Sequence, residues 1–536
     1  MKYPIGIQDF RKIREDGYVY IDKTDLIHDL VKNGAIYFLS RPRRFGKSLL
    51  VSTLKYYFLG EKNLFKGLAI DTLETEWKQY PVFHLDFNGS NFTDPDELGR
   101  TIEAFVAQGE RRYGKAIDEL GIGRRFAHVL HAAHEQTGLR CVVLIDEYDK
   151  PLLDVLDIPD TIRKNNVDKT LEEYNREVLK GFYSVFKAAD QDLQFVLLTG
   201  VTKFSQVSVF SGFNQPNDIS MAPKYDALCG VTTEELHTVF AEGISELAES
   251  LGTTAEDMKR QLKRQYDGYH FSRMMTDVYN PFSLLKAFDN QDIRDFWFQT
   301  GTPSYLLRLL DHCEENVNEL VGRYYDAQEF VDYKADVEKP LPMIYQSGYL
   351  TIKGYDPDVR QFLLDFPNAE VTKGFISLLS ADYFKSKESA SSAVAQMVLA
   401  LKRGDTELYR ELLTSFLASI PYSARRHENE REQERYFQYT VYLLMRLMSV
   451  YTVYHEKQTS QGRADFIIET PKYVYIFEYK LNRPAAEAIE QIDKCGYARE
   501  YATDRRPCFK IGIAFSSETG TISDWACLPV THNGDL

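Results

Sequence analysis

The sequence contains no apolar run that approaches the roughly eighteen residues of a membrane-spanning helix. Residues 1–6 lack the apolar core of a secretory signal peptide. The six cysteines are scattered and include no C-x-x-C pair, which argues against both a zinc site and a disulfide framework. From these absences we expect a reduced, cytoplasmic protein that has no membrane partner.

An excess of positive charge is also absent. The net charge of -15 argues against a protein that coats nucleic acid, because nonspecific affinity comes from neutralising phosphates. The charge is uneven, since residues 421–536 contain 15 Lys and Arg against 16 Asp and Glu, which leaves about -14 for the remainder. The C-terminal segment can therefore approach a polyanion without the repulsion that the rest would impose, which permits DNA binding there.

Residues 35–200 alternate short apolar strands with helix-like stretches, a pattern typical of a parallel sheet covered by helices. Each predicted strand is a nearly continuous apolar run, as expected of a strand buried on both faces. The predicted strands are residues 35–40, 81–87, 141–146 and 194–199.

Residues 226–330 are predicted to be mainly helical, beginning at a threonine cap and acidic first turn in residues 232–235. The chain of 536 residues is too long for one ordinary domain. We therefore predict an α/β multidomain protein with an N-terminal sheet domain, a helical lid or linker and a C-terminal domain. Their predicted bounds are residues 1–225, 226–420 and 421–536.

The first chemical motif follows the strand predicted at residues 35–40. It is the segment Arg-Pro-Arg-Arg-Phe-Gly-Lys-Ser at residues 41–48, after which a helical pattern begins. A strand, a loop and a helix in this order form a P-loop, in which backbone N–H groups and the helix N-terminus hold phosphates. In that arrangement Lys47 reaches the β and γ phosphates of ATP, and the Ser48 hydroxyl binds Mg²⁺.

The loop departs from the usual pattern at its first position, where Arg41 replaces a glycine, and Pro42 removes one N–H group. Positive charge from Arg43 and Arg44 is expected to compensate. A G-K-S triplet can also be an ordinary helix start, so the triplet alone does not establish the site. The nucleotide-binding residues predicted in this loop are Arg43, Arg44, Phe45, Gly46, Lys47, Ser48 and Leu49.

A second acidic motif favours the nucleotide site. The apolar strand predicted at residues 141–146 ends in Asp146 and Glu147, as a Walker B strand does. Asp146 would hold Mg²⁺ through water, and Glu147 would orient the attacking water. Alternatively, these acids cap a helix after the strand. At the end of the strand 194–199, Thr199 is the predicted γ-phosphate sensor, with Lys203 as the alternative.

Near the C-terminus, a carboxylate and an ammonium interrupt the apolar strand predicted at residues 474–480. Because strand side chains alternate, Glu478 and Lys480 lie on one face. Buried charges are costly without partners, and a divalent cation held by Glu478 and Asp465 would supply one. The alternative is a buried Glu478–Lys480 ion pair without metal, but such pairs are weak stabilisers, which favours a functional site.

Motifs in order along nearly the whole chain resemble those of bacterial AAA-ATPase-like proteins that carry a C-terminal PD-(D/E)XK nuclease domain. The form Arg-Pro-Arg-Arg-Phe-Gly-Lys-Ser is characteristic of that family. The resemblance implies an ASCE-type P-loop core with a three-layer αβα sheet, a helical or winged-helix-like middle region and a restriction-endonuclease-like αβ domain. It is carried by residues 4–10, 20–24, 41–50, 144–151, 198–203, 210–220, 266–269, 279–281, 346–352 and 462–480.

The resemblance also assigns roles in the C-terminal domain. Asp465 and Glu478 would be the metal ligands, and Lys480 would orient the attacking water and steady developing negative charge. Glu434 resembles an additional acid of many members, and Gln491 matches the family's glutamine beyond the lysine. With Glu147, these five complete the predicted catalytic residues.

Two sets of phosphate chemistry in one chain lead to a hypothesis. The chain would be an ATPase with ATP and Mg²⁺ as cofactors, coupled to a Mg²⁺-dependent nuclease that binds DNA through its C-terminal domain, in defence or in control of mobile elements. The alternative is a nucleotide-controlled switch that binds a protein or nucleic acid without cleaving it. The sequence assigns neither an arginine finger nor an oligomeric state.

Overall fold

Two units make up the chain, Met1–Val371 and Thr372–Leu536. The computed structural model describes residues 1–116, 120–159, 161–164, 167–204, 216–299, 320–333, 339–384, 389–419, 440–441, 444, 452–459 and 462–530. Among these residues, none of the helices combines the length and the apolar character needed to cross a membrane. The domain limits expected at residues 225 and 420 stay predictions.

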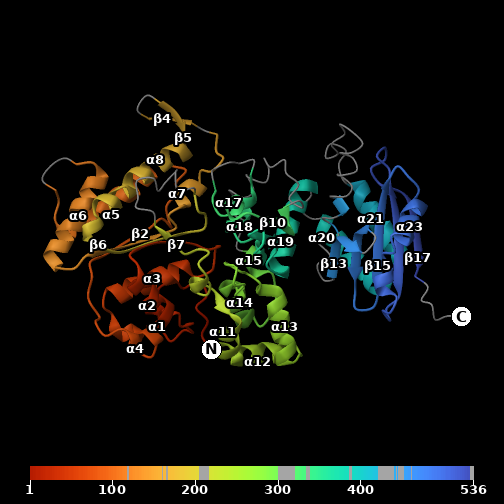
Figure 1. Cartoon of the computed structure of the whole chain (residues 1–536), viewed down its shortest axis with the longest axis horizontal. Helices are drawn as coiled ribbons and strands as arrows, with labels where there is room; N and C mark the ends of the chain where they lie inside the picture. The colour runs from red at the N-terminus through yellow and green to blue at the C-terminus, as the bar shows by residue number, and fades with distance from the viewer. Residues whose placement is uncertain are drawn as a thin grey trace. The chain divides into compact units, whose positions relative to one another are not determined.

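A five-stranded parallel sheet lies at the centre of the first unit (Figure 1). Its order is β2-β3-β6-β1-β7, so β6 separates the strand before the P-loop from the strand that ends in Asp146. This order confirms the predicted α/β fold class with its parallel P-loop sheet. The strands are β1 (Ile36–Ser40), β2 (Val82–Asp86), β3 (Cys141–Asp146), β6 (Leu193–Gly200) and β7 (Asn217–Asp218).

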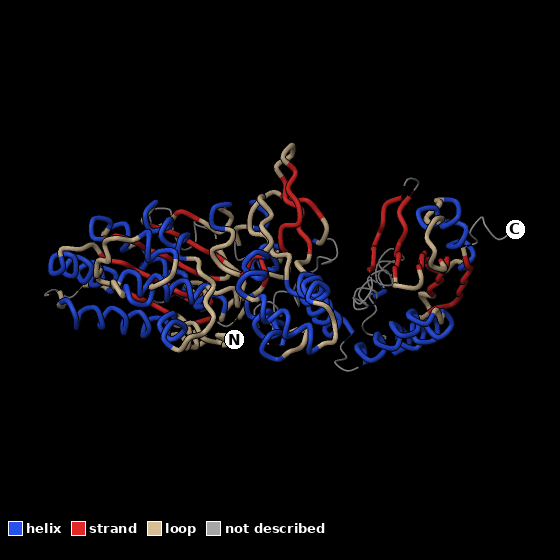
Figure 2. Tube along the Cα trace, turned by 90° about the horizontal axis from the view of Figure 1, so that it is seen from below, coloured by secondary structure: helices blue, strands red, loops and turns tan. Residues whose placement is uncertain are grey.

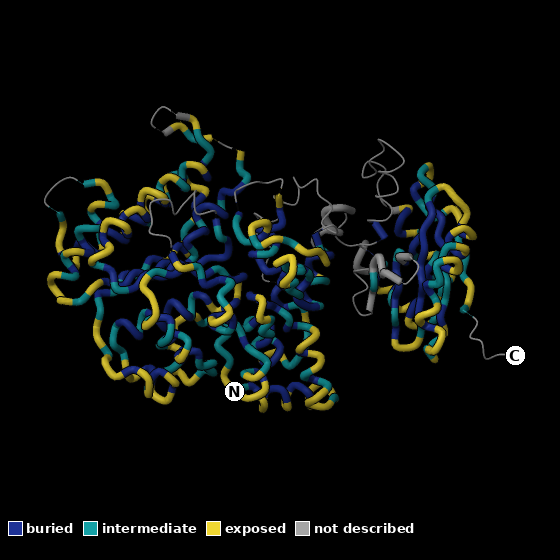
Figure 3. The backbone as a smooth tube through the Cα atoms, viewed as in Figure 1, coloured by how far each residue is buried: buried dark blue, intermediate teal, exposed yellow. Residues whose placement is uncertain are grey.

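Helices cover both faces of this sheet (Figure 2). One group packs through the rings of Phe105, Phe126 and Phe182, whose centroids lie 5.1 to 6.3 Å apart. Strands β3 and β6 at the middle of the sheet are almost entirely buried, within the interior of the unit (Figure 3). The helices are α1 (Phe10–Glu15), α2 (Thr24–Asn33), α3 (Lys47–Phe58), α4 (Ala69–Leu73), α5 (Glu97–Tyr113), α6 (Ile122–Thr137), α7 (Lys150–Leu153), α8 (Leu171–Tyr183) and α9 (Val185–Ala188).

A hairpin and a helical region complete most of the first unit. The hairpin consists of β4 (Thr161–Lys164) and β5 (Val167–Thr170). The helical region begins where predicted, because Thr232 caps the first helix and forms a capping box with Glu235. Its elements are β8 (Val231–Thr232), α11 (Thr233–Val239), α12 (Ala241–Ser250), α13 (Ala255–Tyr266), β9 (Val278–Tyr279), α14 (Pro281–Asn290) and α15 (Phe296–Gln299).

A small antiparallel sheet of order β10-β12-β11 follows. Strand β11 (Thr351–Asp356) follows a turn in which Gly348 adopts φ +89°. Two short helices precede the β11–β12 hairpin. The elements are β10 (Arg323–Tyr325), α17 (Ala327–Phe330), α18 (Leu341–Gln346), β11 (Thr351–Asp356) and β12 (Gln361–Asp365).

The second unit contains a five-stranded mixed sheet of order β13-β14-β15-β16-β17. Strand β15 runs parallel to β16 and antiparallel to β14, and helix α23 packs against β15 and β16. Helix α19 (Ala369–Phe384) begins at the end of the first unit and continues into the second. The other elements are α20 (Ser389–Arg403), α21 (Thr406–Ser419), β13 (Thr452–Thr459), β14 (Gly462–Glu469), β15 (Val474–Leu481), α23 (Ala485–Lys494), β16 (Cys508–Phe515) and β17 (Ile522–Pro529).

Candidate functional site

The loop between β1 and α3 has the backbone form that phosphate binding requires. β1 ends at Ser40 and α3 begins at Lys47. Arg44 and Gly46 adopt left-handed conformations with φ of 70° and 93°, which turn the chain into the helix. The first N–H groups of the twelve-residue helix α3 have no intrahelical acceptors, so they can donate to an anion.

Lys47 is buried at the base of this loop. Its ammonium donates to the carbonyl oxygens of Arg41 at 3.0 Å and Pro42 at 3.3 Å. It also lies 4.0 Å from Glu147 Oε1. The lysine expected to reach phosphates is therefore next to the acid expected to orient water, and its donors face the loop's own carbonyl groups.

Arg41, which replaces the usual first glycine, supports the loop from inside the protein. It is 1% exposed, and its guanidinium donates to the carbonyl oxygens of Ser220 at 2.7 Å and Tyr225 at 3.2 Å. The guanidinium also lies 4.0 Å from the centre of the Phe271 ring. Exposed Arg44 lies over the Phe282 ring at 4.7 Å. The predicted role of Arg43 and Arg44 in binding phosphate stays a prediction.

The structure brings Thr199 to Asp146 at the carboxyl ends of β6 and β3. The Thr199 hydroxyl donates to Asp146 Oδ1 at 2.5 Å, and both side chains are buried. Glu147 follows in a left-handed conformation with φ 55°. The next helix, α7, begins only at Lys150, so Asp146 and Glu147 do not cap it. Of the two sensor candidates, Thr199 contacts the acidic motif.

Lys203, the other sensor candidate, is held by two carboxylates. Its ammonium lies 2.8 Å from Asp218 Oδ2 and 2.8 Å from Asp332 Oδ1. Its backbone N–H donates to Gln346 Oε1 at 2.8 Å. These contacts tie the chain after β6 to the region around α17 and α18.

Asp149 is a residue of this centre that the sequence argument did not single out. Its Oδ2 accepts the backbone N–H groups of Val201 at 3.0 Å and Thr202 at 2.6 Å. Complete burial, followed by the charge of Glu147, raises the pKa of Asp149 to about 7. A Cβ at Gly200 would lie 2.5 Å from Asp149 Oδ1, so the acid and the end of β6 are in close contact. The sequence signal that could have indicated Asp149 is its place three residues after Asp146, in the same acidic segment.

In the second unit, the strand register places Asp465 beside Glu478. Phe466 pairs with Phe477 in the antiparallel β14–β15 ladder, so the next positions carry the two acids. Asp465 Oδ2 accepts the N–H of Tyr479 at 2.9 Å. The structure therefore brings together the two carboxylates on which the predicted metal site depends.

Lys480 connects this pair to helix α23. Its ammonium donates to Gln491 Oε1 at 2.7 Å and to the Tyr479 carbonyl at 3.1 Å, and lies 3.4 Å from Glu478 Oε1. Glu434, the additional predicted acid, lies outside the described residues. Across the described ranges, no three His, Cys, Asp or Glu side chains converge, so Asp465 and Glu478 form a two-carboxylate centre.

The electrostatics of Glu478 fit a cation site better than a simple ion pair. The residue is 2% exposed, and its Oε2 has no hydrogen-bond partner in the described protein. Burial and then the negative charge of Asp465 raise the pKa of Glu478 to about 7, against the opposing effect of Lys480. An ion pair with Lys480 satisfies one oxygen only. A hard divalent cation would satisfy the other and reduce the repulsion from Asp465.

Comparisons with known proteins agree with these two centres. Residues 4–210 match the model of a predicted AAA-ATPase, and residues 432–525 match the PD-(D/E)XK nuclease superfamily. An uncharacterized protein in the vnfD 5' region of Azotobacter chroococcum mcd 1 is 34% identical over 534 residues, which cover 97% of this chain and 98% of that protein. The chain belongs to the AAA-ATPase-like proteins with a C-terminal PD-(D/E)XK nuclease superfamily domain. The resemblance inferred from the motifs is thereby confirmed.

The matched segments of this AAA-ATPase-like protein contain the two centres. The first match includes the loop before α3, the acids after β3 and Thr199. The second includes Asp465, Glu478, Lys480 and Gln491. Both centres therefore lie within segments that match the family models.

Proposed function

We propose that this AAA-ATPase-like protein binds and hydrolyses ATP in its first unit and cleaves DNA in a Mg²⁺-dependent reaction in its second unit. The observation that carries the proposal is the buried Glu478 Oε2, which lies beside Asp465 and has no hydrogen-bond partner among the described residues. A protein that needed only a stable sheet would gain little from a buried Glu478 beside the partly buried Asp465 of the adjacent strand, because the buried carboxylate loses its hydration and the two charges repel. A cation-dependent reaction explains why both are there.

In the ATPase centre, residues 43–49 would bind the triphosphate. Among them, Lys47 would supply its ammonium, and the start of α3 would supply its N–H groups. Ser48 and Asp146 would hold Mg²⁺, which neutralises charge on the phosphates. Thr199 keeps the Asp146 carboxylate oriented through its hydroxyl. Glu147, 4.0 Å from Lys47, would position the attacking water once the lysine turns to the phosphates.

In the nuclease centre, Asp465 and Glu478 would hold Mg²⁺, which lowers the pKa of bound water and polarises the phosphodiester. Gln491 fixes the Lys480 ammonium from helix α23. Lys480 can then orient water and stabilise the negative charge that develops on the phosphate. The nearly neutral charge of residues 421–536 is compatible with DNA as the substrate.

The test uses supercoiled plasmid with Mg²⁺, with and without ATP, and scores nicking together with ATP hydrolysis. Asp465→Asn should abolish nicking and leave hydrolysis intact, whereas Lys47→Ala should abolish hydrolysis. Equal nicking by wild type and Asp465→Asn would refute the nuclease centre. Hydrolysis without cleavage of any DNA or RNA would instead support the nucleotide-controlled switch.

A role in defence or mobile-element control and a cytoplasmic location are further parts of the proposal. Challenge of cells with phage or plasmid tests the proposed role.

A further inference from the structure

Helix α19 begins in the first unit, and its first turn is connected to the nucleotide loop. Ala369–Val371 belong to the first unit, and the rest of the helix belongs to the second. The chain therefore leaves the ATPase unit along a helix whose N-terminal turn is fixed within that unit. Two separate sets of contacts lead from residues 43–45 of the loop to this turn.

The first set passes through Trp297. The indole Nε1–H of this residue donates to the Arg43 carbonyl oxygen at 3.3 Å. Its backbone N–H donates to Glu370 Oε1 at 2.6 Å. Trp297 is 7% exposed and Glu370 is buried, so water cannot readily replace either partner. One residue thus bridges the backbone of the loop and the first turn of α19.

The buried carboxyl of Glu370 is suited to this contact. Burial raises its pKa to about 8, so the group is largely uncharged at neutral pH. Glu370 therefore holds Trp297 without the desolvation cost of a buried negative charge.

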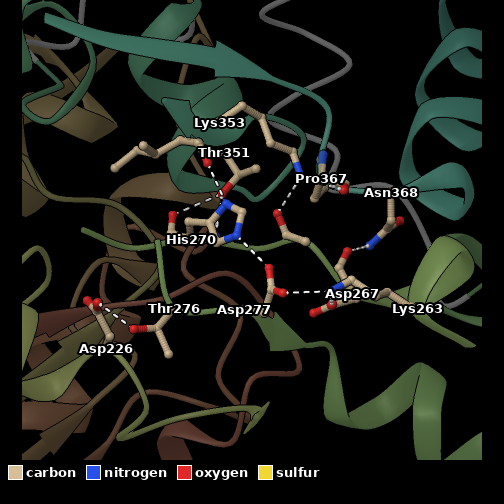
Figure 4. Close-up of polar contacts among 12 residues, drawn as sticks. Asp226, Lys263, Asp267, His270, Thr276, Asp277, Thr351, Lys353, Pro367 and Asn368 are labelled. Atoms are coloured by element: carbon tan, nitrogen blue, oxygen red, sulfur yellow. Dashed lines mark hydrogen bonds and ion pairs between the residues drawn. The ribbon is translucent and has the colours of Figure 1, made fainter. Parts of the chain in front are cut away.

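The second set passes through Phe45 and the segment before β9. The buried Phe45 ring meets Tyr269 edge-on, with the ring centroids 4.8 Å apart. Two residues earlier, the carbonyl of Asp267 accepts the Asn368 side-chain N–H at 2.9 Å (Figure 4). Asn368 Oδ1 in turn accepts the N–H of Val371 at 3.0 Å and so caps the first turn of α19.

The residues of this second set of contacts are packed tightly against one another. Lys353 donates to the carbonyl oxygens of Gly268 at 2.7 Å and Pro367 at 2.9 Å (Figure 4). Gly268 has φ +89°, and a Cβ there would lie 2.3 Å from the Pro367 oxygen. The segment that contacts Phe45 is thus pressed directly against the residues before α19. Movement of the loop cannot be absorbed between them.

Nucleotide binding must alter the loop end of both sets. Two of the three N–H donors of the Lys47 ammonium are directed to the carbonyl groups of Arg41 and Pro42, so full engagement with phosphate requires the lysine to turn away from them. The Arg43 carbonyl lies in the same short turn, with left-handed Arg44 next to it. A turn that re-forms around phosphates changes the direction of this carbonyl relative to the Trp297 indole.

We propose that Trp297 is a positioning residue of the nucleotide loop and couples nucleotide occupancy to the first turn of α19. The proposal rests on ATP binding at Lys47, as proposed above. Because coupling between two sites is reciprocal, the state of α19 also changes the affinity of the loop for nucleotide. Loss of the indole hydrogen bond is expected to change the nucleotide Kd by about two- to tenfold.

Tryptophan fluorescence tests the contact directly in the full chain. The sequence has three tryptophans, Trp77, Trp297 and Trp525, and the double variant W77F/W525F leaves only Trp297. Titration with Mg²⁺ and a nonhydrolysable ATP analogue should shift its emission, with the same midpoint as binding measured by calorimetry. The matched control is W297F/W525F, because the Trp77 indole also donates to a backbone carbonyl, that of Glu74 at 3.2 Å, away from the loop. Its emission should not change.

Hydrogen exchange tests the far end of the coupling. In wild type, the analogue should change exchange of the amides at residues 369–373, and W297F should reduce that change. W297F retains an aromatic ring near Tyr349, whose centroid is 5.1 Å from the indole, so the packing is largely kept. Binding by calorimetry with unchanged Trp297 emission and unchanged exchange would overturn this inference and leave the proposed ATP site standing. Failure of the analogue to bind would refute the ATP site itself, and the inference with it.

Discussion

The Thr199 hydroxyl donates to Asp146 Oδ1 at 2.5 Å across the neighbouring strands β6 and β3. Replacement by valine keeps the shape of the side chain and removes the donor. We expect Thr199→Val to lower kcat for ATP hydrolysis about 10- to 100-fold, because the Asp146 carboxylate loses its orientation. Thr199→Ser, which keeps the hydroxyl, should retain most activity. Equal loss in both variants would show that packing, and not the hydrogen bond, matters at this position.

Arg41→Gly restores the usual P-loop glycine and should nevertheless harm the protein. The change leaves the buried carbonyl groups of Ser220 and Tyr225 without donors and opens a cavity beside Phe271. We expect the unfolding free energy of the first unit to fall by about 3 kcal/mol or more. Urea unfolding followed by circular dichroism measures the effect. A variant as stable as wild type would contradict the supporting role of the buried guanidinium.

Glu478→Gln should separate activity from stability in the second unit. The amide can still accept from Lys480, and it removes a negative charge that Asp465 repels. We expect nicking to be lost, while the unfolding free energy stays unchanged or rises by about 1 kcal/mol. Thermal unfolding with and without Mg²⁺ adds a second measurement, because stabilisation by Mg²⁺ should disappear in the variant. A strongly destabilised variant would favour the purely structural ion pair.

Glu370 should make the stability of the first unit depend on pH. Its pKa is about 8 in the folded chain against an ordinary value of 4.5. The folded state therefore keeps a proton that the unfolded state has released, and stability falls as pH rises between these values. Glu370→Gln removes this dependence, so its stability relative to wild type should increase with pH. Denaturant unfolding across the interval measures it, with exposed Glu256→Gln as the control that should follow wild type.

The strands that shape the nucleotide centre could be predicted from the sequence because burial on both faces leaves continuous apolar runs. The strand predicted at residues 141–146 has those limits in the structure, and the one predicted at 194–199 is β6, Leu193–Gly200. The proximity of Asp465 and Glu478 could also be predicted from the sequence, because two strands joined by a short connection pair as an antiparallel hairpin. The catalytic roles of these residues stay predictions.

Contacts between residues far apart in the chain could not be predicted in this way. Arg41 was recognised as a departure from the P-loop pattern, but nothing local shows that its guanidinium turns inward to residues 220 and 225. The contact of Trp297 with Arg43 spans 254 positions and involves a backbone carbonyl, which has no sequence signal. Asp149 resembles any acid in a turn until β6 is placed beside it.

The absence of a side chain at Gly200 has a mechanical consequence. Even a methyl group there would collide with Asp149 and Tyr148, so the terminus of β6 abuts the acidic turn with no gap. We therefore expect the two to move together in the proposed ATP cycle. One distance probe would be attached at the end of β6 and the other in the turn that contains Tyr148 and Asp149. Their separation should accordingly stay constant during the ATP cycle, while the surrounding helices shift.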